Sequence, residues 1–132
     1  MREWAGRTFV VATWLVLAAV LVQMLLAGFG IFADAGFLVW HATASAGVVF
    51  LLPLLVLLLG WWGRVPGHIL RLAAAVPALV IVQSLLLAPY HVNAQGVLRA
   101  VSGLHVLNAI LIFWVALHLV ERARTWSPAA SS

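Results

Sequence analysis

The sequence has no cysteine and no lysine, and only 8% of its 132 residues are charged. Without cysteine, the chain can form neither a disulfide scaffold nor a thiolate metal site, and it has no thiol nucleophile. A soluble domain carries roughly 25% charged residues and 45–50% apolar ones, whereas 66% of this chain is hydrophobic. These values exclude a water-soluble globule and a disordered tail, and they indicate an integral membrane protein.

Carboxylates are also missing from the apolar runs themselves. The acidic residues Glu3, Asp34 and Glu121 all lie at the boundaries of these runs, which argues against a carboxylate-bridged metal site and a conventional proton relay. The scattered arginines form no basic patch of the kind that binds nucleic acid. No Ser-His-Asp set, glycine-rich phosphate loop or H-E-x-x-H motif is present. We therefore expect no independent enzymatic activity.

Four apolar stretches are long enough to cross a bilayer, which takes about 20 residues for a core of about 30 Å. They cover residues 8–30, 37–62, 66–89 and 99–120, and short connections join them. Short connections make consecutive helices antiparallel, so the predicted fold is all-α, an up-down bundle of four transmembrane helices. The first span is longer than the apolar core of a signal peptide, about 7–15 residues, so we expect it to be retained. The predicted domain covers residues 1–124, followed by a flexible tail at residues 125–132.

The distribution of arginine predicts the orientation of the bundle, because positive side chains favour the cytoplasmic side. Only Arg99 falls on the outer side of the four-span arrangement. Both termini are therefore predicted in the cytoplasm, with the chain in the bacterial cytoplasmic (inner) membrane. The arginines on the inner side are Arg2, Arg7, Arg64, Arg71, Arg122 and Arg124.

The first apolar hairpin is weakly repeated in the second. The segment VQMLLA at residues 22–27 is echoed by VQSLLL at residues 82–87, and His41 is echoed by His105. Two hairpins that start on the same side would be related by a pseudo-twofold axis along the membrane normal. The matches fit either duplication of one hairpin or coincidence within an apolar alphabet.

Two histidines lie inside the predicted spans at similar depth, His41 in the second and His105 in the fourth. At 1.5 Å per residue, both are roughly 6–8 Å below the outer boundary. The second and fourth helices are diagonal in an up-down bundle, so the imidazoles can face each other across its centre. Bis-histidine ligation of a b-type haem requires this arrangement. The alternative is that each histidine bonds a neighbouring carbonyl and joins two helices.

Four further polar residues fall in the outer half. Gln23 and Gln83 can form interhelical hydrogen bonds or line the edge of a cofactor or quinone pocket. Asn108 lies about one turn after His105, and Arg99 can pair with a haem propionate or with lipid headgroups. The candidate cofactor-binding residues are His41, His105, Arg99, Gln23, Gln83 and Asn108, with His41 and His105 as the metal ligands.

The remaining histidines are weaker candidates. His118 lies about 220° round the helix from His105, so it is predicted to point away from that face. His68 is predicted among the lipid headgroups, and His91 in the outer loop as a surface residue or a lid. A second, inner haem held by His68 and His118 stays an alternative.

The residues 23–30, His41, the turn at 63–66, Gln83 and the segment LHVLNA at 104–109 resemble a family of small four-helix bacterial membrane proteins of unknown function. This resemblance covers nearly the whole chain. It implies the fold and no activity.

The layout is also similar to one four-helix half of haem A synthase, in which haem-ligating histidines begin the second and fourth helices on the outer side. His41 and His105 have a similar position and separation. The sequence departs from that family because only one half is present, Ala42 replaces the arginine that commonly follows the first histidine, and there is no cysteine pair. The resemblance implies a single b-type haem rather than synthase activity.

Together these features predict a cytochrome b-like membrane protein with one haem b near the extracytoplasmic side, used for electron transfer or as a small subunit of a redox complex. One haem near one face cannot carry electrons across the bilayer, so a redox partner, a quinone or a larger membrane complex is expected besides lipid. The alternative is a cofactor-free structural or assembly subunit. A small carrier or channel is disfavoured because the spans lack charges.

Overall fold

The computed structural model describes residues 2–126, and each of its regular elements is a helix. Four helical spans are long and apolar enough to cross a membrane, namely Trp4–Phe32, Gly36–Trp62, Gly67–His91 and Gly96–Thr125. The four predicted helices are confirmed, and the arrangement is that of a multi-pass membrane protein. The elements are α1 (Arg2–Phe32), α2 (Gly36–Ala44), the π-helix η1 (Ser45–Val49), α3 (Phe50–Trp62), α4 (Gly67–His91), α5 (Gly96–Ala100), the 3₁₀-helix η2 (Val101–Gly103) and α6 (Leu104–Thr125).

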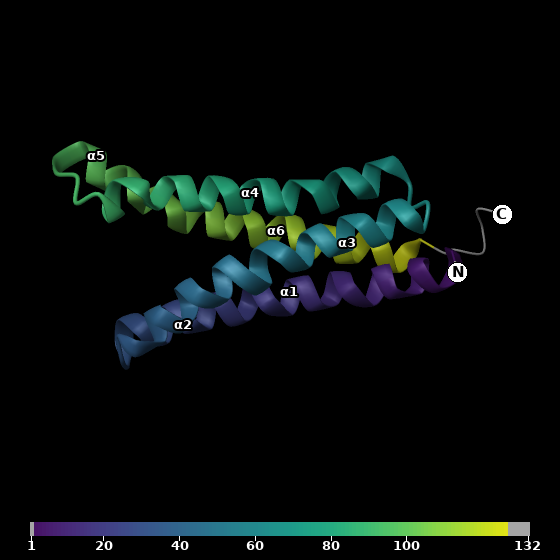
Figure 1. Cartoon of the computed structure of the whole chain (residues 1–132), viewed down its shortest axis with the longest axis horizontal. Helices are drawn as coiled ribbons and strands as arrows, with labels where there is room; N and C mark the ends of the chain where they lie inside the picture. Colours follow the sequence, from purple (N-terminus) through teal and green to yellow (C-terminus); the bar gives the residue numbers. More distant parts are fainter. Residues whose placement is uncertain (1, 127–132) are drawn as a thin grey trace.

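The helices form a bundle in which consecutive spans run in opposite directions (Figure 1). α3 and α6 both pack against α1 and against α4, so α1 lies opposite α4 and α3 lies opposite α6. The start of α1, the turn between α3 and α4, and the end of α6 share one end of the bundle, here named the terminal end. α2 and α5 lie at the other end, here named the distal end.

The hydrophobic core is tightest toward the terminal end. Phe9, Val56, Val76 and Ala116 have no exposed surface, whereas α2 and α5 contain no buried residue. Figure 1 shows the α1–α2 hairpin diverging from the α4–α6 hairpin toward the distal end. Close van der Waals packing is the main force that holds helices together in lipid. The terminal end therefore fixes the bundle, and the distal half holds two hairpins that pack more loosely against each other.

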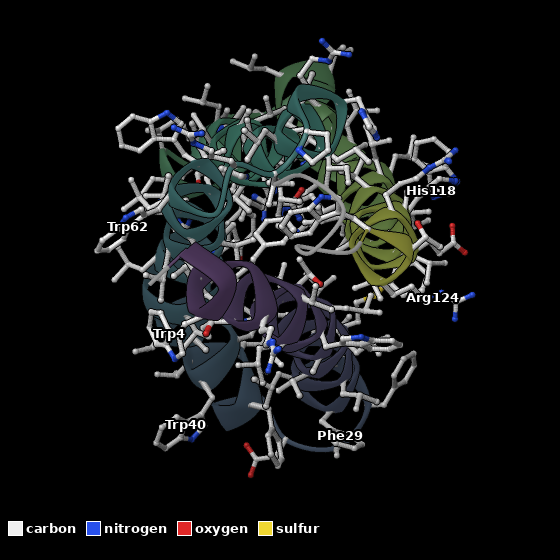
Figure 2. The ribbon with its side chains drawn as sticks, turned by 90° about the vertical axis from the view of Figure 1, so that its right-hand side faces the viewer. Trp4, Phe29, Trp40, Trp62, His118 and Arg124 are labelled. Carbon is white, nitrogen blue, oxygen red and sulfur yellow. The ribbon has the colours of Figure 1, made fainter. Side chains whose placement is uncertain are left out.

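Large aromatic side chains lie on the perimeter of the bundle. Figure 2 shows Trp4, Phe29, Trp40 and Trp62 pointing away from the bundle axis, and at least half of the surface of each side chain is exposed. Trp4 and Trp62 lie near the terminal end and the other two near the distal end. These are the positions that aromatic rings occupy at the two interfaces of a membrane.

The second span is not the single α-helix predicted for residues 37–62, because the π-helix Ser45–Val49 interrupts it. Pro53 follows Val49 by one turn and lies inside α3. Since proline has no N–H, it cannot bond the carbonyl four residues earlier, and the preceding turn is free to rearrange. A π-helical segment accommodates an extra residue in the helix. The side chains of α2, which include His41, therefore point in a different direction relative to those of α3 than they would in one continuous α-helix.

The first and last helices of the chain extend beyond the predicted spans. α1 begins at Arg2 rather than residue 8, and α6 ends at Thr125 rather than residue 120. The predicted tail at residues 125–132 lies outside the described residues, apart from Thr125 and Trp126.

Gly60 provides a test of the packing at the terminal end. A Cβ atom added there would lie 2.7 Å from Leu70 Cδ2 and 2.8 Å from Phe9 Cε2. Gly60→Ala is expected to lower the free energy of unfolding by about 1–3 kcal/mol, the usual cost of overpacking. Nothing lies within 4 Å of a Cβ atom added at Gly28, so the control Gly28→Ala should raise it by about 0.5–1 kcal/mol. Denaturant titration in detergent measures both variants, and equal effects would contradict the close packing at Gly60.

Candidate functional site

His41 of α2 and His105 of α6 approach each other in the distal half of the bundle. Their ring centroids are 6.4 Å apart, and their ring planes make an angle of 70°. Each ring comes from a different hairpin, and both side chains are partly buried. The structure thus brings together the two residues predicted as metal ligands.

Gln23 of α1 contacts His41 through the Nδ1 atom of the ring. His41 Nδ1 donates to the main-chain carbonyl oxygen of Gln23 at 3.0 Å. The Gln23 side chain is oriented by its hydrogen bonds: its oxygen accepts from the Ser45 N–H at 2.8 Å, and its nitrogen lies 2.7 Å from His41 Nδ1. The neutral ring can therefore adopt either tautomer. When Nδ1 carries the proton, Nε2 keeps the lone pair that a metal requires.

Gln83 of α4 contacts both nitrogens of His105. Its side-chain amide donates to His105 Nε2 at 3.0 Å, and its main-chain carbonyl oxygen lies 3.4 Å from His105 Nδ1. Asn108, which is 8% exposed, donates to Gln83 Oε1 at 2.6 Å and to the Leu79 carbonyl oxygen at 2.9 Å. This network fixes the orientation of the Gln83 amide, and it places the proton of the His105 ring on Nδ1.

The two hairpins repeat the same contact. In each one, the histidine Nδ1 faces the main-chain carbonyl of a glutamine on the preceding long helix. These glutamines, Gln23 and Gln83, occupy the same position in the repeated VQxLL segment. Because the hydrogen-bond contacts repeat as well as the amino-acid sequence, the structure favours duplication of a hairpin over coincidence.

The two rings are about as far apart as two imidazoles that share one metal ion. A transition metal bonds an imidazole nitrogen at about 2 Å, which puts the centroids of two such rings about 6 Å apart, close to the 6.4 Å observed. Each ring also has a main-chain carbonyl near Nδ1, the usual partner of the second nitrogen of a metal-bound histidine. The Nε2 atom of His105, however, lies 3.0 Å from the Gln83 amide. Within residues 2–126, no group of three or more His, Asp or Glu side chains is placed to hold a metal ion.

The other predicted candidates lie apart from this pair. Arg99 of α5 places its guanidinium carbon 5.4 Å from the centroid of the Tyr90 ring, and His91 also packs against Tyr90. His118 lies on the side of α6 that faces away from the bundle axis (Figure 2). Its Nδ1 donates to the Trp114 carbonyl oxygen at 3.0 Å. His118 therefore points away from His105, as its spacing predicts.

Two serines near the pair were not predicted to contribute. Ser45 bonds the Gln23 side chain through its backbone N–H, a contact that depends on the π-helix and has no signal in the sequence beyond the nearby Pro53. Ser102 Oγ is buried and has no hydrogen-bond partner within residues 2–126. It lies one turn before His105, in the 3₁₀-helix η2.

Asn108 and Ser102 give opposite expectations for stability. Asn108→Ala removes two hydrogen bonds between α6 and α4 and is expected to lower the free energy of unfolding by about 1 kcal/mol, a typical value inside membranes. Ser102→Ala removes a buried hydroxyl that has no partner, so it should leave stability unchanged or raise it by up to about 1 kcal/mol. Thermal unfolding in detergent compares the variants. A larger loss in Ser102→Ala than in Asn108→Ala would show that these contacts are assigned wrongly.

Comparisons with known proteins extend the sequence resemblance but give no activity. A model described as a family of unknown function (DUF6220) matches residues 23–89, a segment that contains Gln23, His41 and Gln83. No curated protein and no solved structure matches the chain.

Proposed function

Since the chain belongs to the DUF6220 family, whose function is unknown, we propose a function from its histidine pair: binding of one haem b for electron transfer. His41 and His105 would hold the haem iron in this proposal. The observation that carries it is the 6.4 Å separation of two rings from different hairpins, each with Nδ1 directed at a main-chain carbonyl.

The chain's own residues have distinct tasks in this site. The carbonyls of Gln23 and Gln83 lie at the Nδ1 atoms of the two rings, and they would accept the Nδ1 protons in the tautomer that leaves Nε2 free for a metal. The Gln83 side chain now occupies His105 Nε2, so it must release this nitrogen before a metal can bind there. Asn108 keeps a second bond to the Leu79 carbonyl and can hold α6 against α4 during that change. The haem, when bound, supplies a one-electron carrier.

The placement in the membrane follows from the arginines. Five arginines, apart from Arg2, lie toward the terminal end, and Arg99 lies at the distal end. We place the terminal end and both chain termini in the cytoplasm of a bacterial inner membrane, and the haem near the extracytoplasmic side. Arg99 is then the cation nearest that side and complements the carboxylates of a haem. The arginines of the terminal end are Arg7, Arg64, Arg71, Arg122 and Arg124.

A site at one side of the bilayer needs an electron donor or acceptor on the other. The acidic residues lie at or near the ends of the spans, and the histidine pair lies in the distal half only. The protein therefore acts with a redox partner, with a quinone, or as a small subunit of a larger membrane complex.

One observation favours a second function, that of a cofactor-free structural or assembly subunit. His105 Nε2 already accepts a hydrogen bond from Gln83 at 3.0 Å, and Asn108 completes a network that joins α4 to α6. In that role the polar side chains only join helices, and each of them has a protein partner.

Haem titration distinguishes the two functions. The full chain, purified in detergent, is titrated with haem, and the visible spectrum is recorded. The haem function predicts a low-spin Soret band that saturates at one haem per chain and is lost in His41→Ala and in His105→Ala, because each removes an axial ligand. His118→Ala is the matched control, because His118 belongs to the same helix as His105 but faces away from the bundle axis. This variant should retain the band.

Two results would contradict haem binding by His41 and His105. One is a wild-type protein that gives only the spectrum of free haem in micelles, which, with Asn108→Ala still destabilising the protein, supports the structural subunit instead. The other is a band that survives in His41→Ala and in His105→Ala while His118→Ala removes it, which would place the haem at His118.

A further inference from the structure

Arg64 occupies an unusual position in the turn between α3 and α4. The Val65 N–H donates to the Gly60 carbonyl oxygen at 2.9 Å, and the Arg64 N–H donates to the Trp61 carbonyl oxygen at 3.2 Å. This pair of bonds defines a Schellman motif, whose first residue after the helix cap must be left-handed. Arg64 takes that conformation, with φ of 55°, although glycine fits it without steric cost.

The same motif ends α4, where the chain uses a more suitable residue. The Ala94 N–H donates to the Pro89 carbonyl oxygen at 2.9 Å, and the Asn93 N–H donates to the Tyr90 carbonyl oxygen at 3.1 Å. Asn93 is left-handed, with φ of 54°, and asparagine is commonly found there. Arginine at the equivalent position carries strain, and such strain is concentrated at functional sites. The backbone conformation does not favour arginine at this position. We therefore attribute its presence to an interaction of its side chain.

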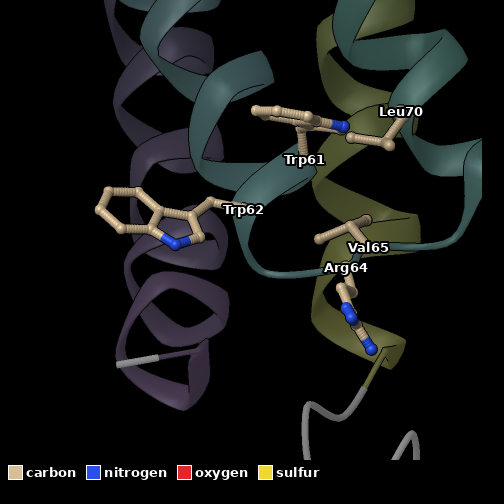
Figure 3. Close-up of a pocket in the computed structure, with 5 residues that line it drawn as sticks. All are labelled: Trp61, Trp62, Arg64, Val65 and Leu70. Atoms are coloured by element: carbon tan, nitrogen blue, oxygen red, sulfur yellow. The ribbon is translucent and has the colours of Figure 1, made fainter.

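A pocket of about 490 Å³ lies beside this turn (Figure 3). It is an open hollow at the surface rather than an enclosed cavity. Val65 is 4% exposed and forms the buried side of the turn, while Trp61 and Trp62 are 74% and 60% exposed. The residues that line the pocket are Trp61, Trp62, Arg64, Val65 and Leu70.

We infer that this pocket binds the headgroup of an anionic phospholipid, with the Arg64 guanidinium on the phosphate. A guanidinium donates two parallel hydrogen bonds to a phosphate, and the indole N–H groups of Trp61 and Trp62 are donors at the level of lipid headgroups. None of the five lining residues is acidic. The site lies at the end of the bundle that carries five arginines, and it is separate from the histidine pair.

The pocket at the distal end has the opposite character. Its volume is about 210 Å³, and its lining includes the carboxylate of Asp34 with Phe37 and Trp40. Exposed indoles and a pocket therefore occur at both ends, but only the pocket at the terminal end combines them with a cation. Charge complementarity assigns the anionic headgroup to the pocket at Arg64.

Native mass spectrometry tests this site on the full chain released from bilayers of equal phosphatidylglycerol and phosphatidylcholine. Wild type is expected to retain phosphatidylglycerol preferentially, and Arg64→Gly to reduce that retention about fivefold, the effect of one arginine at an anionic surface. Glycine preserves the left-handed turn, so the variant should unfold at the same or a higher temperature than wild type. Arg71→Gln, which removes an exposed arginine from α4 near the same end, and Asn93→Gly, which changes the equivalent turn residue, should retain the lipid as wild type does.

Equal retention of phosphatidylglycerol by wild type and Arg64→Gly would overturn the site. An equal loss in Arg71→Gln would also overturn it, because a diffuse positive surface would then explain the preference. If millimolar inorganic phosphate displaces the lipid from wild type, the pocket binds free phosphate, and the assignment to a lipid headgroup is wrong.

Discussion

A polar side chain inside a spanning helix must find a hydrogen-bond partner in the protein, because hydrocarbon offers none. For the two histidines of the pair this partner is a glutamine of the same hairpin, Gln23 for His41 and Gln83 for His105. The helices within each hairpin are joined by this contact, which orients the imidazole. When two such hairpins pack into a bundle, their rings are brought within reach of one ligand.

The tightly packed core and the histidine pair lie in different halves of the molecule. Phe9, Val56 and Ala116 belong to the hydrophobic core and have no exposed surface. α2 contributes no buried residue, so its position depends on the Gln23 contact and on its connection through the π-helix. The distal half is therefore less tightly fixed than the terminal end, which keeps the helices in register.

The four helices and their antiparallel order could be predicted because each span must supply about 20 apolar residues. The diagonal placement of His41 and His105 followed from the order of the spans. The π-helix could not be predicted, since it depends on Pro53 together with a tertiary contact between Gln23 and Ser45. The partners of the glutamines could not be predicted either, because they depend on how each helix is rotated about its axis.

The turn at Arg64 illustrates the same limit. The letters Gly63-Arg64 favour glycine as the left-handed residue, yet Gly63 is still helical with φ of −72°. The helix continues one residue further because Val65 must reach the core, where it is 4% exposed. Tertiary packing thus decides which residue is left-handed.

The most direct test of the account is the low-temperature electron paramagnetic resonance spectrum of the full chain loaded with ferric haem. Two imidazole ligands give low-spin iron, and ring planes far from parallel make the signal strongly anisotropic. Ligation by both His41 and His105 therefore predicts a low-spin signal, which is strongly anisotropic where the ring planes keep the 70° angle between them. A high-spin signal, or one identical to free haem in micelles, would contradict the claim that the two hairpins jointly bind one iron.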